Sequence, residues 1–552
     1  MSTFYTTELS HIYDANLAAH VAPRLQNLVE HYRRWIATPV ETDLTEQDAF
    51  LITYADQVRQ SGEKPLKTLG EFCKTNLHDL ISGMHILPFF PWSSDDGFSV
   101  MDYRSVDPSL GNWQDVEQIG DSFRLMVDGV INHVSVQGDW FQAFLKDELP
   151  YRNYFLTMDE KADLSRVVRP RALPLLTDFI TTAGKRHVWT TFSADQADLD
   201  YHNPGVLLEI IDILLMYAEH GAQFIRLDAI AYLWKEIGTT CIHLPQTHAI
   251  VRLMRAVLDE IAPHVYIVTE TNVPHTDNIS YFGDGYNEAQ LVYNFALPPL
   301  VLHTFRTGDS SILSQWASKL NLPSERTTFF NFLASHDGIG LNPVRGILSP
   351  VDIAALVDQT LKHDGLISYK QNSDGTQSPY ELNINYFDAL SNPDGDEPLD
   401  LQIDRFMAAQ AIMLSLRGVP GIYFHSLFGS RNWCEGVQAT HQNRSINRQK
   451  LELNNLVDEL ADQTSLRSQV FNRFRCLLLL RASSAAFHPD GPQEILDVGR
   501  GIFGVLCTSP NGNQRMLCLQ NVTSQPQVVS VHNTTIALAP YQTLWKPMPQ
   551  SH

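Results

Sequence analysis

The sequence predicts an α/β protein whose core is a (β/α)8 barrel, the TIM-barrel architecture, with lid insertions after strands 3 and 7 and a C-terminal antiparallel β domain. Two observations lead to this prediction. First, eight short runs rich in β-branched and aromatic residues alternate with helical patterns from residue 50 onward. Strands separated by helices imply right-handed parallel crossovers, and eight of them over roughly 430 residues suit a closed barrel with insertions. Second, polar residues cluster where these strands end.

The elements are expected in a simple order along the chain. An N-terminal helical extension covers residues 1–48, where apolar residues recur at helical spacing, namely Leu25, Leu28, Val29, Tyr32 and Trp35. The barrel is assigned to residues 49–133 and 215–484. Its eight strands are expected at 50–56, 83–90, 124–133, 222–232, 264–272, 289–297, 327–337 and 418–426.

Two intervals between strands are too long for a single crossover helix. The first, residues 134–214, is predicted to be a lid domain inserted after strand 3. The second, residues 340–398, contains the polar stretch KQNSDGTQSPYELN and is predicted to be a second lid after strand 7. Aromatic residues and prolines in both intervals favour ordered lids over disordered linkers. Short strands separated by turn residues such as PNGN then predict the small β domain at 485–552.

Composition and charge narrow the class of protein. The 552 residues are 44% hydrophobic and 18% charged, which is typical of a soluble globular protein. Lys+Arg 40 against Asp+Glu 62 gives a net charge of −22, which argues against nucleic acid or an anionic membrane as a partner. No targeting segment or membrane span is evident, and the six cysteines form no CxxC pair. We therefore expect a reduced, cytoplasmic enzyme with no metal and no cofactor.

The residues expected to carry chemistry lie at strand ends. Arg226 and Asp228 are two apart in a strand, so both side chains point to one face, toward the barrel mouth. Taken alone, this pair could equally be a structural ion pair in the core. Glu270 ends the fifth strand, and His336 and Asp337 end the seventh. Barrel active sites are built at this face, so the three carboxylates are interpreted as one catalytic group.

Three ionised carboxylates that converge on one pocket repel each other. One of them should therefore have a raised pKa and donate a proton, while another stays ionised. A retaining glycoside reaction needs this division, because one carboxylate attacks the anomeric carbon and a protonated partner protonates the leaving oxygen.

At this point the sequence resembles the α-amylase superfamily, glycoside hydrolase family thirteen. Its four strand-end signatures are matched in order by DGVINH, FIRLDAIAY, VYIVTE and FLASHD. The resemblance implies that Asp228 is the nucleophile, Glu270 the general acid/base and Asp337 the carboxylate that stabilises the transition state. The resemblance further implies that three residues bind the glucosyl unit and hold the carboxylates: Arg226, His133 and His336.

Within the superfamily, the chain looks most like sucrose phosphorylases and related α-glucoside phosphorylases. The stretches that carry this likeness include WSSDDGFSVMDYRSVDPSLG, RPRALP, KEIGTTC and NRSINR. The likeness places Asp95 and Phe98 at the non-reducing end of the glucose, with Arg444 paired to Asp95, so that only a single glucosyl unit fits. It also places Phe192 and Gln196 at the sugar. The alternatives are that the two phenylalanines are ordinary core residues and that Gln196 only satisfies backbone groups.

The likeness also suggests where phosphate and the acceptor bind. Arg171 would face phosphate, and Tyr380 would help the lids to exclude water, although the basic RVVRPR stretch could instead be a solvated lid surface. Glu381 and Asn272 stand where sucrose phosphorylases have Gln and His. Here the chain resembles glucosylglycerate phosphorylases, whose acidic aglycone would need a cation such as Arg345 or Lys370, which could also bind a buried Glu381.

The sequence therefore predicts a retaining α-glucoside phosphorylase. It would transfer a glucosyl unit from a small α-glucoside, best guessed as glucosylglycerate, to inorganic phosphate through a β-glucosyl-enzyme, giving α-glucose 1-phosphate. As acceptors we expect glycerate, then glycerol, then fructose. The alternatives are a sucrose or glucosylglycerol phosphorylase, a hydrolase or transglucosidase on the same fold, and a sugar-binding protein that has lost catalysis. The sequence leaves a homodimer and the aglycone open.

Overall fold

The computed structural model describes residues 2–37, 43–372, 374–531 and 534–549. Eight parallel strands close into a barrel in the order β1-β17-β13-β12-β11-β10-β4-β3. All eight coincide with the predicted strands, and each is shorter than its sequence pattern because the polar ends continue as loops above the barrel. The strands are β1 (Phe50–Thr53), β3 (Gly83–Ile86), β4 (Arg124–Gly129), β10 (Ala222–Leu227), β11 (Tyr266–Thr269), β12 (Leu291–Tyr293), β13 (Thr328–Asn331) and β17 (Val419–Tyr423).

Aromatic side chains fill the lower part of the barrel, away from the strand ends. The Phe50 ring lies 4.7 Å from the Phe224 ring and 5.9 Å from the Phe330 ring. Two glycines provide the space for them: a Cβ at Gly83 would lie 2.3 Å from the Phe50 ring, and one at Gly421 would lie 2.2 Å from Phe330. The barrel interior is therefore a packed core here.

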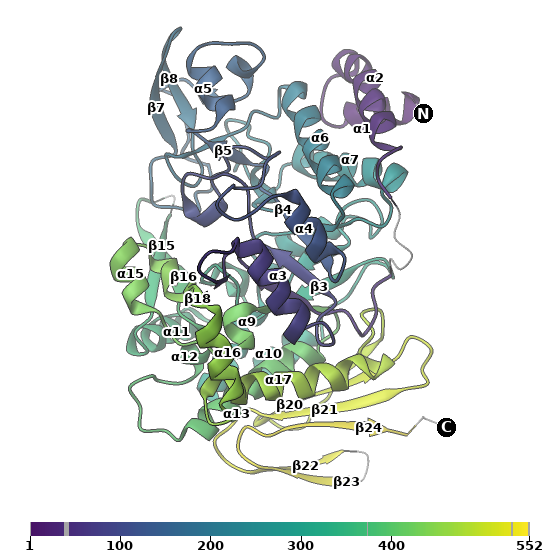
Figure 1. Cartoon of the computed structure of the whole chain (residues 1–552), viewed down its shortest axis with the longest axis vertical. Coiled ribbons are helices and arrows are strands. Elements are labelled where there is room, and N and C mark those ends of the chain that lie inside the picture. The colour runs from purple at the N-terminus through teal and green to yellow at the C-terminus, as the bar shows by residue number, and fades with distance from the viewer. Residues whose placement is uncertain (1, 38–42, 373, 532–533, 550–552) are drawn as a thin grey trace.

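Helices surround the barrel. The main ones are α3 (Pro65–Asn76), α4 (Trp113–Gly120), α6 (Pro204–Glu219), α7 (Pro245–Ile261), α9 (Leu297–Thr307), α10 (Ser311–Ala317), α13 (Leu399–Ser415), α16 (Leu453–Ala461) and α17 (Leu466–Ala482). The N-terminal helices α1 (Ser2–Ser10) and α2 (Ala15–Tyr32) pack beside α7 and α6 (Figure 1). The Tyr32 hydroxyl donates to Asp212 on α6 at 2.9 Å, which ties this extension to the barrel. No helix within the described residues is both long and apolar enough to cross a membrane.

The first insertion, called lid 1, follows β4. Its strands are β5 (His133–Ser135) and β9 (Gln196–Asp198), which pair with each other, and β6 (Thr157–Met158), β8 (Gly184–Trp189) and β7 (Leu176–Thr181), which form a second sheet; α5 (Asp139–Leu145) lies among them. Helix α6 spans the boundary predicted at 214/215. It begins at Pro204 because the Asn203 side chain accepts a hydrogen bond from the Gly205 N–H at 2.9 Å and so caps the helix. The sequence pattern had assigned the first part of this helix to the lid.

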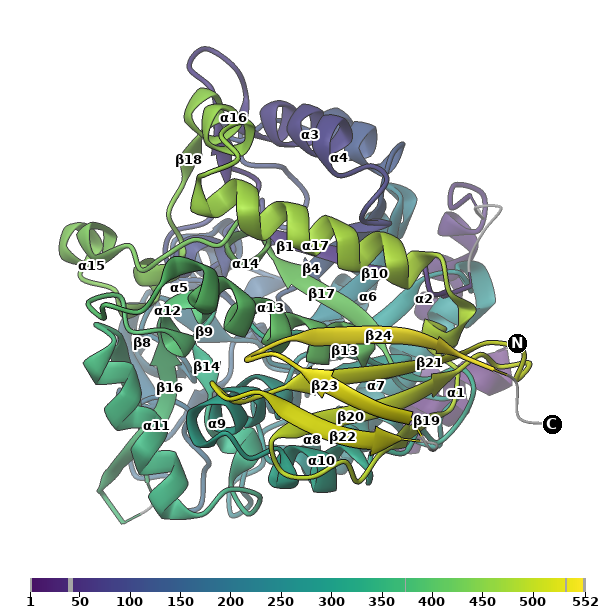
Figure 2. The same cartoon turned by 90° about the horizontal axis from the view of Figure 1, so that it is seen from below.

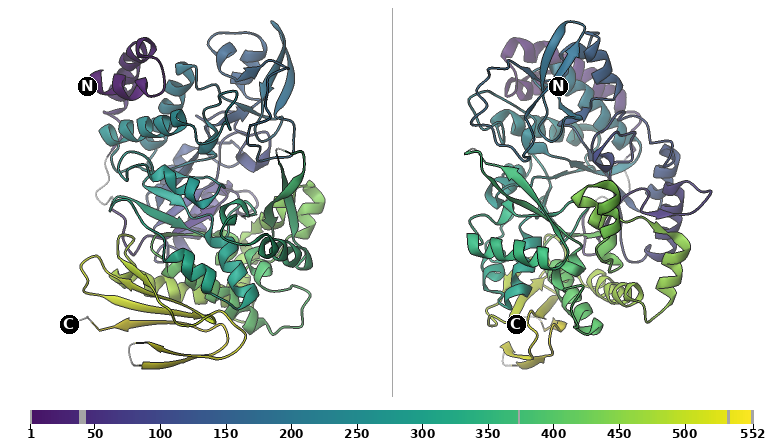
Figure 3. Two further views of the ribbon diagram at one scale, coloured as in Figure 1. Left: turned by 180° about the vertical axis from the view of Figure 1, so that it is seen from behind. Right: turned by 90° about the vertical axis from the view of Figure 1, so that its left-hand side faces the viewer.

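The second insertion, called lid 2, follows β13. Its three strands are ordered β14 (Ile339–Gly340), β16 (Gln377–Asn383), β15 (Leu366–Gln371), and α11 (Pro350–Lys362) and α12 (Tyr386–Leu390) accompany them. The two lids lie on the same side of the barrel, as the two views of Figure 3 show. The short helices α8 (His275–Asn278), α14 (Phe424–Leu427) and α15 (Cys434–Thr440) complete the loops at the strand ends.

Residues after 484 form an antiparallel sheet in the order β19 (Gln493–Ile495), β20 (Ile502–Thr508), β21 (Arg515–Asn521), β24 (Thr543–Met548), with a separate pair β22 (Gln527–Val531) and β23 (Thr534–Leu538). In Figure 2 these strands lie below the barrel, next to α10 and α13. The Ser310 hydroxyl donates to the Ile502 carbonyl at 2.8 Å, which joins this domain to the base of the barrel, remote from the lids. All six cysteines are free thiols.

Candidate active site

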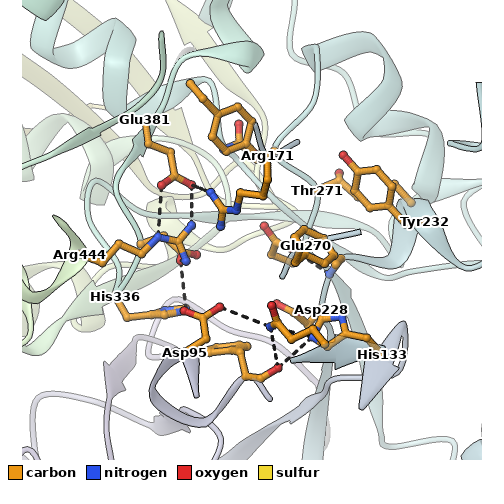
Figure 4. Close-up of a pocket in the computed structure, with 18 of the residues that line it drawn as sticks. Asp95, His133, Arg171, Asp228, Tyr232, Glu270, Thr271, His336, Glu381 and Arg444 are labelled. Carbon is orange, nitrogen blue, oxygen red and sulfur yellow. Dashed lines mark hydrogen bonds and ion pairs between the residues drawn. The ribbon is translucent and has the colours of Figure 1, made fainter. Parts of the chain in front are cut away.

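A pocket lies at the carboxyl ends of the barrel strands, beneath the two lids. Figure 4 shows acidic and basic side chains from both lids and from the barrel converging on it. Among the sequence-predicted residues, fourteen line it: Asp95, Phe98, His133, Arg171, Phe192, Gln196, Asp228, Glu270, Asn272, His336, Asp337, Tyr380, Glu381 and Arg444. Arg226 lies just below the pocket, and Arg345 lies outside it.

The backbone after β10 links two of the three carboxylates. Asp228 directly follows this strand, and its N–H donates to the Gly129 carbonyl at 3.1 Å. Ala229 then adopts a left-handed conformation, with φ of +50°. Its N–H donates to Glu270 Oε2 at 3.0 Å. The turn thus fixes Glu270 beside Asp228. A reaction in which one carboxylate attacks an atom and the other protonates the group that leaves it requires this closeness.

Arg226 connects the site to the barrel core. It is almost fully buried and forms ion pairs with the buried Asp128 and, at 3.1 Å, with Asp228. Asp128 also accepts from His85 Nε2 at 2.8 Å. The sequence left open whether Arg226 and Asp228 form a structural or a functional pair. The geometry combines the two readings, because Arg226 is fixed by Asp128 below and orients Asp228 above.

The three carboxylates have different electrostatic surroundings. Burial raises the pKa of Asp228 well above its ordinary value; Arg226 opposes this shift and Glu270 adds to it. Burial also raises the pKa of Glu270, with Arg226 opposing and Asp337 adding. Burial would raise the pKa of Asp337 as well, but Arg444 lowers it well below its ordinary value. Burial and mutual repulsion therefore favour a proton on the Asp228–Glu270 pair, whereas Arg444 favours the ionised form of Asp337.

Asp337 owes its low pKa to a cluster of cationic groups. Arg444 Nη1 lies 2.6 Å from its Oδ1, and Arg448 Nη2 lies 4.0 Å from the same oxygen. His336 Nε2 is 3.5 Å away, although burial lowers the pKa of His336 well below its ordinary value and keeps the ring neutral. The Asn447 side chain donates to the Asp337 carbonyl at 3.1 Å and holds the backbone in place.

The end of the pocket nearest β3 is closed by the loop that carries Asp95 and Phe98. The Phe98 ring stacks on His336 with centroids 4.6 Å apart and planes 1° apart. The Phe98 carbonyl accepts from His133 Nε2 at 2.8 Å and from Gln196 Nε2 at 3.1 Å. Gln196 therefore satisfies a backbone carbonyl, which was the alternative considered from the sequence. It also lines the pocket.

The expected pair between Arg444 and Asp95 is wrong for the described residues. Arg444 instead makes its ion pairs with Asp337 and with Glu381. The reason is burial: Glu381 is only 2% exposed, and a carboxylate so far from water must have a cation beside it. The neighbour Asp96 has its own partner, Arg448, at 2.5 Å.

The expected partner of Glu381 is also corrected. Arg444 binds it with two parallel contacts, Nη2 to Oε1 at 2.6 Å and Nε to Oε2 at 3.2 Å. Arg345 is exposed, and its guanidinium donates to Asn342 and to the Pro379 carbonyl, both at 3.1 Å. Lys370 does not line the pocket either.

The strand register of lid 2 explains the position of Lys370. On the β15–β16 hairpin, Glu381 lies opposite Ser368, whereas Lys370 lies opposite Ser378. Lys370 is therefore farther out along the hairpin, away from the barrel.

Arg171, from the irregular segment of lid 1, approaches the same oxygen of Glu381 as Arg444 does. Its Nη1 lies 4.0 Å from Glu381 Oε1, and its guanidinium lies 5.7 Å from the centre of the Tyr380 ring. The side chain is 24% exposed. Figure 4 shows Arg444 below Glu381 and Arg171 beside it. Arg171 is thus the residue of the basic stretch that faces the pocket, whereas Arg166 is exposed.

Besides the small residues Ala229 and Ala231, sequence reasoning missed three further lining residues, Tyr232, Thr271 and Phe295. The Tyr232 ring lies 5.6 Å from Phe192, and the two rings form one wall. All three follow barrel strands within a few residues, so the strand-end rule could have found them. Their ordinary aromatic and hydroxyl side chains gave no other signal. Within the described ranges, no group of three or more His, Cys, Asp or Glu could hold a metal ion.

A (β/α)8 barrel with Asp, Glu and Asp gathered in this way defines an α-amylase-type protein that acts on glycosidic bonds. The model of the α-amylase catalytic domain matches residues 77–338. The glucosylglycerate phosphorylase of Allomeiothermus silvanus is 53% identical over 512 residues, 91% of each chain. That of Escherichia coli is 44% identical and covers 98% of this chain and 99% of its own. The chain therefore belongs to the glucosylglycerate phosphorylase family of the α-amylase superfamily.

A solved structure agrees with the fold. The crystal structure of sucrose 6F-phosphate phosphorylase from Thermoanaerobacter thermosaccharolyticum superposes with a TM-score of 0.77 at 24% identity. It covers 91% of this chain and 100% of its own. This likeness supports the barrel, the lids and the C-terminal sheet as one shared architecture.

Proposed function

We propose that this protein is a retaining glucosylglycerate phosphorylase, which converts glucosylglycerate and inorganic phosphate to α-glucose 1-phosphate and glycerate. The observation that carries the proposal is the arrangement of Arg171 and Arg444 around Glu381, in the same pocket as the carboxylate pair Asp228 and Glu270. A hydrolase needs only the carboxylates and a water, whereas a phosphorylase must also bind an anion at the same place. The family of the chain agrees with this reading.

The first step forms the glucosyl-enzyme. The Asp228 carboxylate attacks C1 of the glucosyl unit as the bond between C1 and the glycerate oxygen breaks, and Glu270 gives its proton to that oxygen. Only Asp228 of the two has a guanidinium in contact, at 3.1 Å, whereas Glu270 has a neutral backbone N–H. The cation favours ionised Asp228, so the proton belongs on Glu270. Asp337, held ionised by Arg444, offsets the positive charge that develops on the sugar.

The second step transfers the glucosyl unit to phosphate. After glycerate leaves, phosphate takes its place, and one phosphate oxygen attacks C1 as the bond to Asp228 breaks. Glu270 accepts the proton that the attacking oxygen carried, which restores the starting state. Two displacements at C1 return the α configuration, so the product is α-glucose 1-phosphate.

Arg171 is the group that we assign to the anions. Among the described residues, its guanidinium approaches Glu381 only at 4.0 Å, longer than a hydrogen bond, so its N–H donors can serve a ligand. Glycerate carboxylate and phosphate are both small anions that present oxygens in the same plane to such a fork. One cation then serves the leaving aglycone in one step and the incoming phosphate in the next.

A panel of acceptors tests the proposal. The protein is incubated with α-glucose 1-phosphate and glycerate, glycerol, fructose or fructose 6-phosphate, and phosphate release is measured. We expect the fastest release with glycerate, then glycerol, then fructose. Fructose or fructose 6-phosphate as best acceptor would assign a sucrose-type phosphorylase instead. Turnover of glucosylglycerate that does not depend on phosphate would assign a hydrolase, and no turnover at all would leave a sugar-binding protein.

The setting of the enzyme is part of the same proposal. A net charge of −22 supports a role without nucleic acid or membrane partners, and the free thiols support a cytoplasmic location. The homodimer considered from the sequence is tested by light scattering of the purified protein, which reports the mass in solution directly.

A further inference from the structure

The loop between β3 and α4, which closes the glucose end of the pocket, has a strained backbone. Asp95, Asp96 and Gly97 follow one another with φ of +55°, +49° and +109°. Only glycine adopts such values without cost, and the first two residues are aspartates. A strained segment persists only where its surroundings over-determine it, and such segments cluster at functional sites. Asp95 and Phe98 of this loop line the pocket. Other residues must therefore hold the loop in its strained conformation.

One contact that holds the loop is the ion pair that Asp96 makes with Arg448 at 2.5 Å. Arg448 is buried, and its Nε donates to the His336 carbonyl at 2.9 Å. This contact restrains the middle of the loop from the segment that follows α15. It does not restrain the two ends of the loop.

Residues at the two ends of the loop make hydrogen bonds to a single carboxylate of lid 1, that of Asp195. Ser93 Oγ donates to its Oδ2 at 2.6 Å, Ser94 Oγ makes a hydrogen bond to the same oxygen, and Ser99 Oγ lies 2.8 Å from it. Ser93 and Ser94 precede the strained residues and Ser99 follows them. A fourth hydroxyl, that of Ser135 on β5, lies 2.5 Å from Ser93 Oγ.

The backbone of Asp195 is fixed as well. Its carbonyl accepts from the Val136 N–H at 3.0 Å and from Ser99 Oγ at 3.2 Å. The next residue, Gln196, donates to the Phe98 carbonyl at 3.1 Å. Two adjacent lid residues therefore hold the loop at its base and at its tip.

We propose that Asp195 is a positioning residue for the reaction: by drawing Ser93, Ser94 and Ser99 onto one carboxylate, it keeps Asp95 and Phe98 in the conformation that binds the glucosyl unit. Asp195 itself does not line the pocket, so its effect must pass through the loop. The proposal rests on the proposed function in so far as the ligand is a glucosyl unit. It ties binding of the sugar to the ordering of lid 1.

Affinity for glucose gives a test that needs no turnover. Calorimetric titration with glucose compares the wild-type protein, Asp195→Ala, Asp195→Asn and the pair Ser94→Ala/Ser99→Ala. The matched control is Asp178→Ala, since Asp178 is a lid 1 carboxylate that pairs with Lys185 at 2.6 Å, far from the loop. We expect Asp195→Ala to weaken glucose binding by about tenfold or more, which corresponds to roughly 1.4 kcal/mol. Asp195→Asn, which keeps one acceptor oxygen, should lie between Asp195→Ala and the wild type.

Kinetics then separate positioning from general damage. The kcat/KM for α-glucose 1-phosphate reports loading of the free enzyme and should fall in parallel with glucose affinity. The kcat/KM for glycerate should fall less, because the glucosyl unit is by then covalently held. Combining Asp195→Ala with Ser94→Ala/Ser99→Ala should cost little more than Asp195→Ala alone, since both act through the same contacts.

The outcomes are distinct. Unchanged glucose affinity in Asp195→Ala, a loss matched by Asp178→Ala, or an equal fall in both kcat/KM values would each overturn the role of Asp195. If Asp195→Ala does not fold, Asp195→Asn and the serine variants decide the question by the same criteria. Failure of the wild-type protein to use α-glucose 1-phosphate would refute the proposed function, while the glucose titration would still judge Asp195.

Discussion

Arg444 binds Glu381 through two parallel contacts, at 2.6 and 3.2 Å, while the same guanidinium holds Asp337 at 2.6 Å. One cation thus joins a carboxylate of lid 2 to a carboxylate at the end of β13. Asp337 has its low pKa from this contact, and Glu381 holds the same guanidinium from the side of lid 2.

The first prediction concerns the nucleophile and the acid. Asp228→Asn should have no measurable turnover, because a neutral amide cannot attack C1. Glu270→Gln should slow glucosylglycerate cleavage by about 10²–10⁴-fold, the usual contribution of a general acid. With α-glucosyl fluoride, whose leaving group needs no proton, Glu270→Gln should form the glucosyl-enzyme at nearly the wild-type rate. Rapid-quench measurement of that step gives the check, and a near-normal rate for Asp228→Asn would disprove the assignment.

The second prediction concerns phosphate. Arg171→Ala should raise the KM for phosphate by about 10- to 150-fold, which corresponds to the loss of roughly 1.5–3 kcal/mol from one charged hydrogen-bond partner. Since water still reaches the glucosyl-enzyme, the ratio of hydrolysis to phosphorolysis should increase. Arg166→Ala, an exposed arginine of the same segment, is the control. If both variants kept wild-type phosphate kinetics, Arg171 would be no more than part of the lid surface.

The third prediction concerns pH. Burial raises the pKa of Glu270, and the first step needs its protonated form. The kcat/KM for glucosylglycerate should therefore fall tenfold per pH unit above this raised pKa, and on the acid side it should fall where Asp228 becomes protonated. With α-glucosyl fluoride, this alkaline fall of the first step should be absent. An identical alkaline fall for both substrates would assign the titration to another group.

The fourth prediction follows from the corrected position of Arg345 and Lys370. Neither residue lines the pocket, so Arg345→Ala and Lys370→Ala should change the preference for glycerate over glycerol by no more than about twofold, as is usual for surface substitutions. Arg171→Ala should abolish most of that preference. Ratios of kcat/KM for the two acceptors provide the measurement. A selective loss in Lys370→Ala would mean that lid 2 closes farther over the pocket when substrate binds.

The fifth prediction concerns stability. Lys235 is buried, and its Nζ lies 2.6 Å from Asp198 Oδ2 and 2.8 Å from Asn132 Oδ1. Lys235→Met leaves Asp198 as an uncompensated buried charge, so urea unfolding should show a loss of about 3–5 kcal/mol. Lys185→Met, which breaks the exposed pair with Asp178, should change stability little. Equal effects would mean that water reaches Asp198.

The sequence was sufficient for the barrel because the strands are marked by apolar runs, and several of them also by polar residues at their ends. Asp228, Glu270 and Asp337 could be brought together for the same reason, since parallel strands share one edge. The partners of Glu381 could not be predicted. The choice between Arg444 and Lys370 depends on a register shift between Ser368 and Tyr369, which moves Lys370 outward.

The contacts of Asp195 could not be predicted from the sequence either. Serines in WSSDDGFS and an aspartate about one hundred residues later carry no periodic signal. Their meeting depends on how β9 pairs with β5 after a long insertion, with Ser135 opposite Gln196. Side-chain hydrogen bonds between distant loops follow from tertiary structure, whereas strands and strand ends follow from local pattern.

The pairing of β14 with β16 has a consequence for how products leave. Ile339 and Gly340, two and three residues after Asp337, are in ladder register with Leu382 and Glu381. Lid 2 is therefore a continuation of the segment that carries Asp337. Opening lid 2 would break the backbone pairing of β14 with β16 next to that carboxylate. Lid 1 has no such attachment around Arg171, because residues 159–175 contain no helix or strand. We therefore expect α-glucose 1-phosphate to leave on the Arg171 side, past the residue assigned to hold its phosphate.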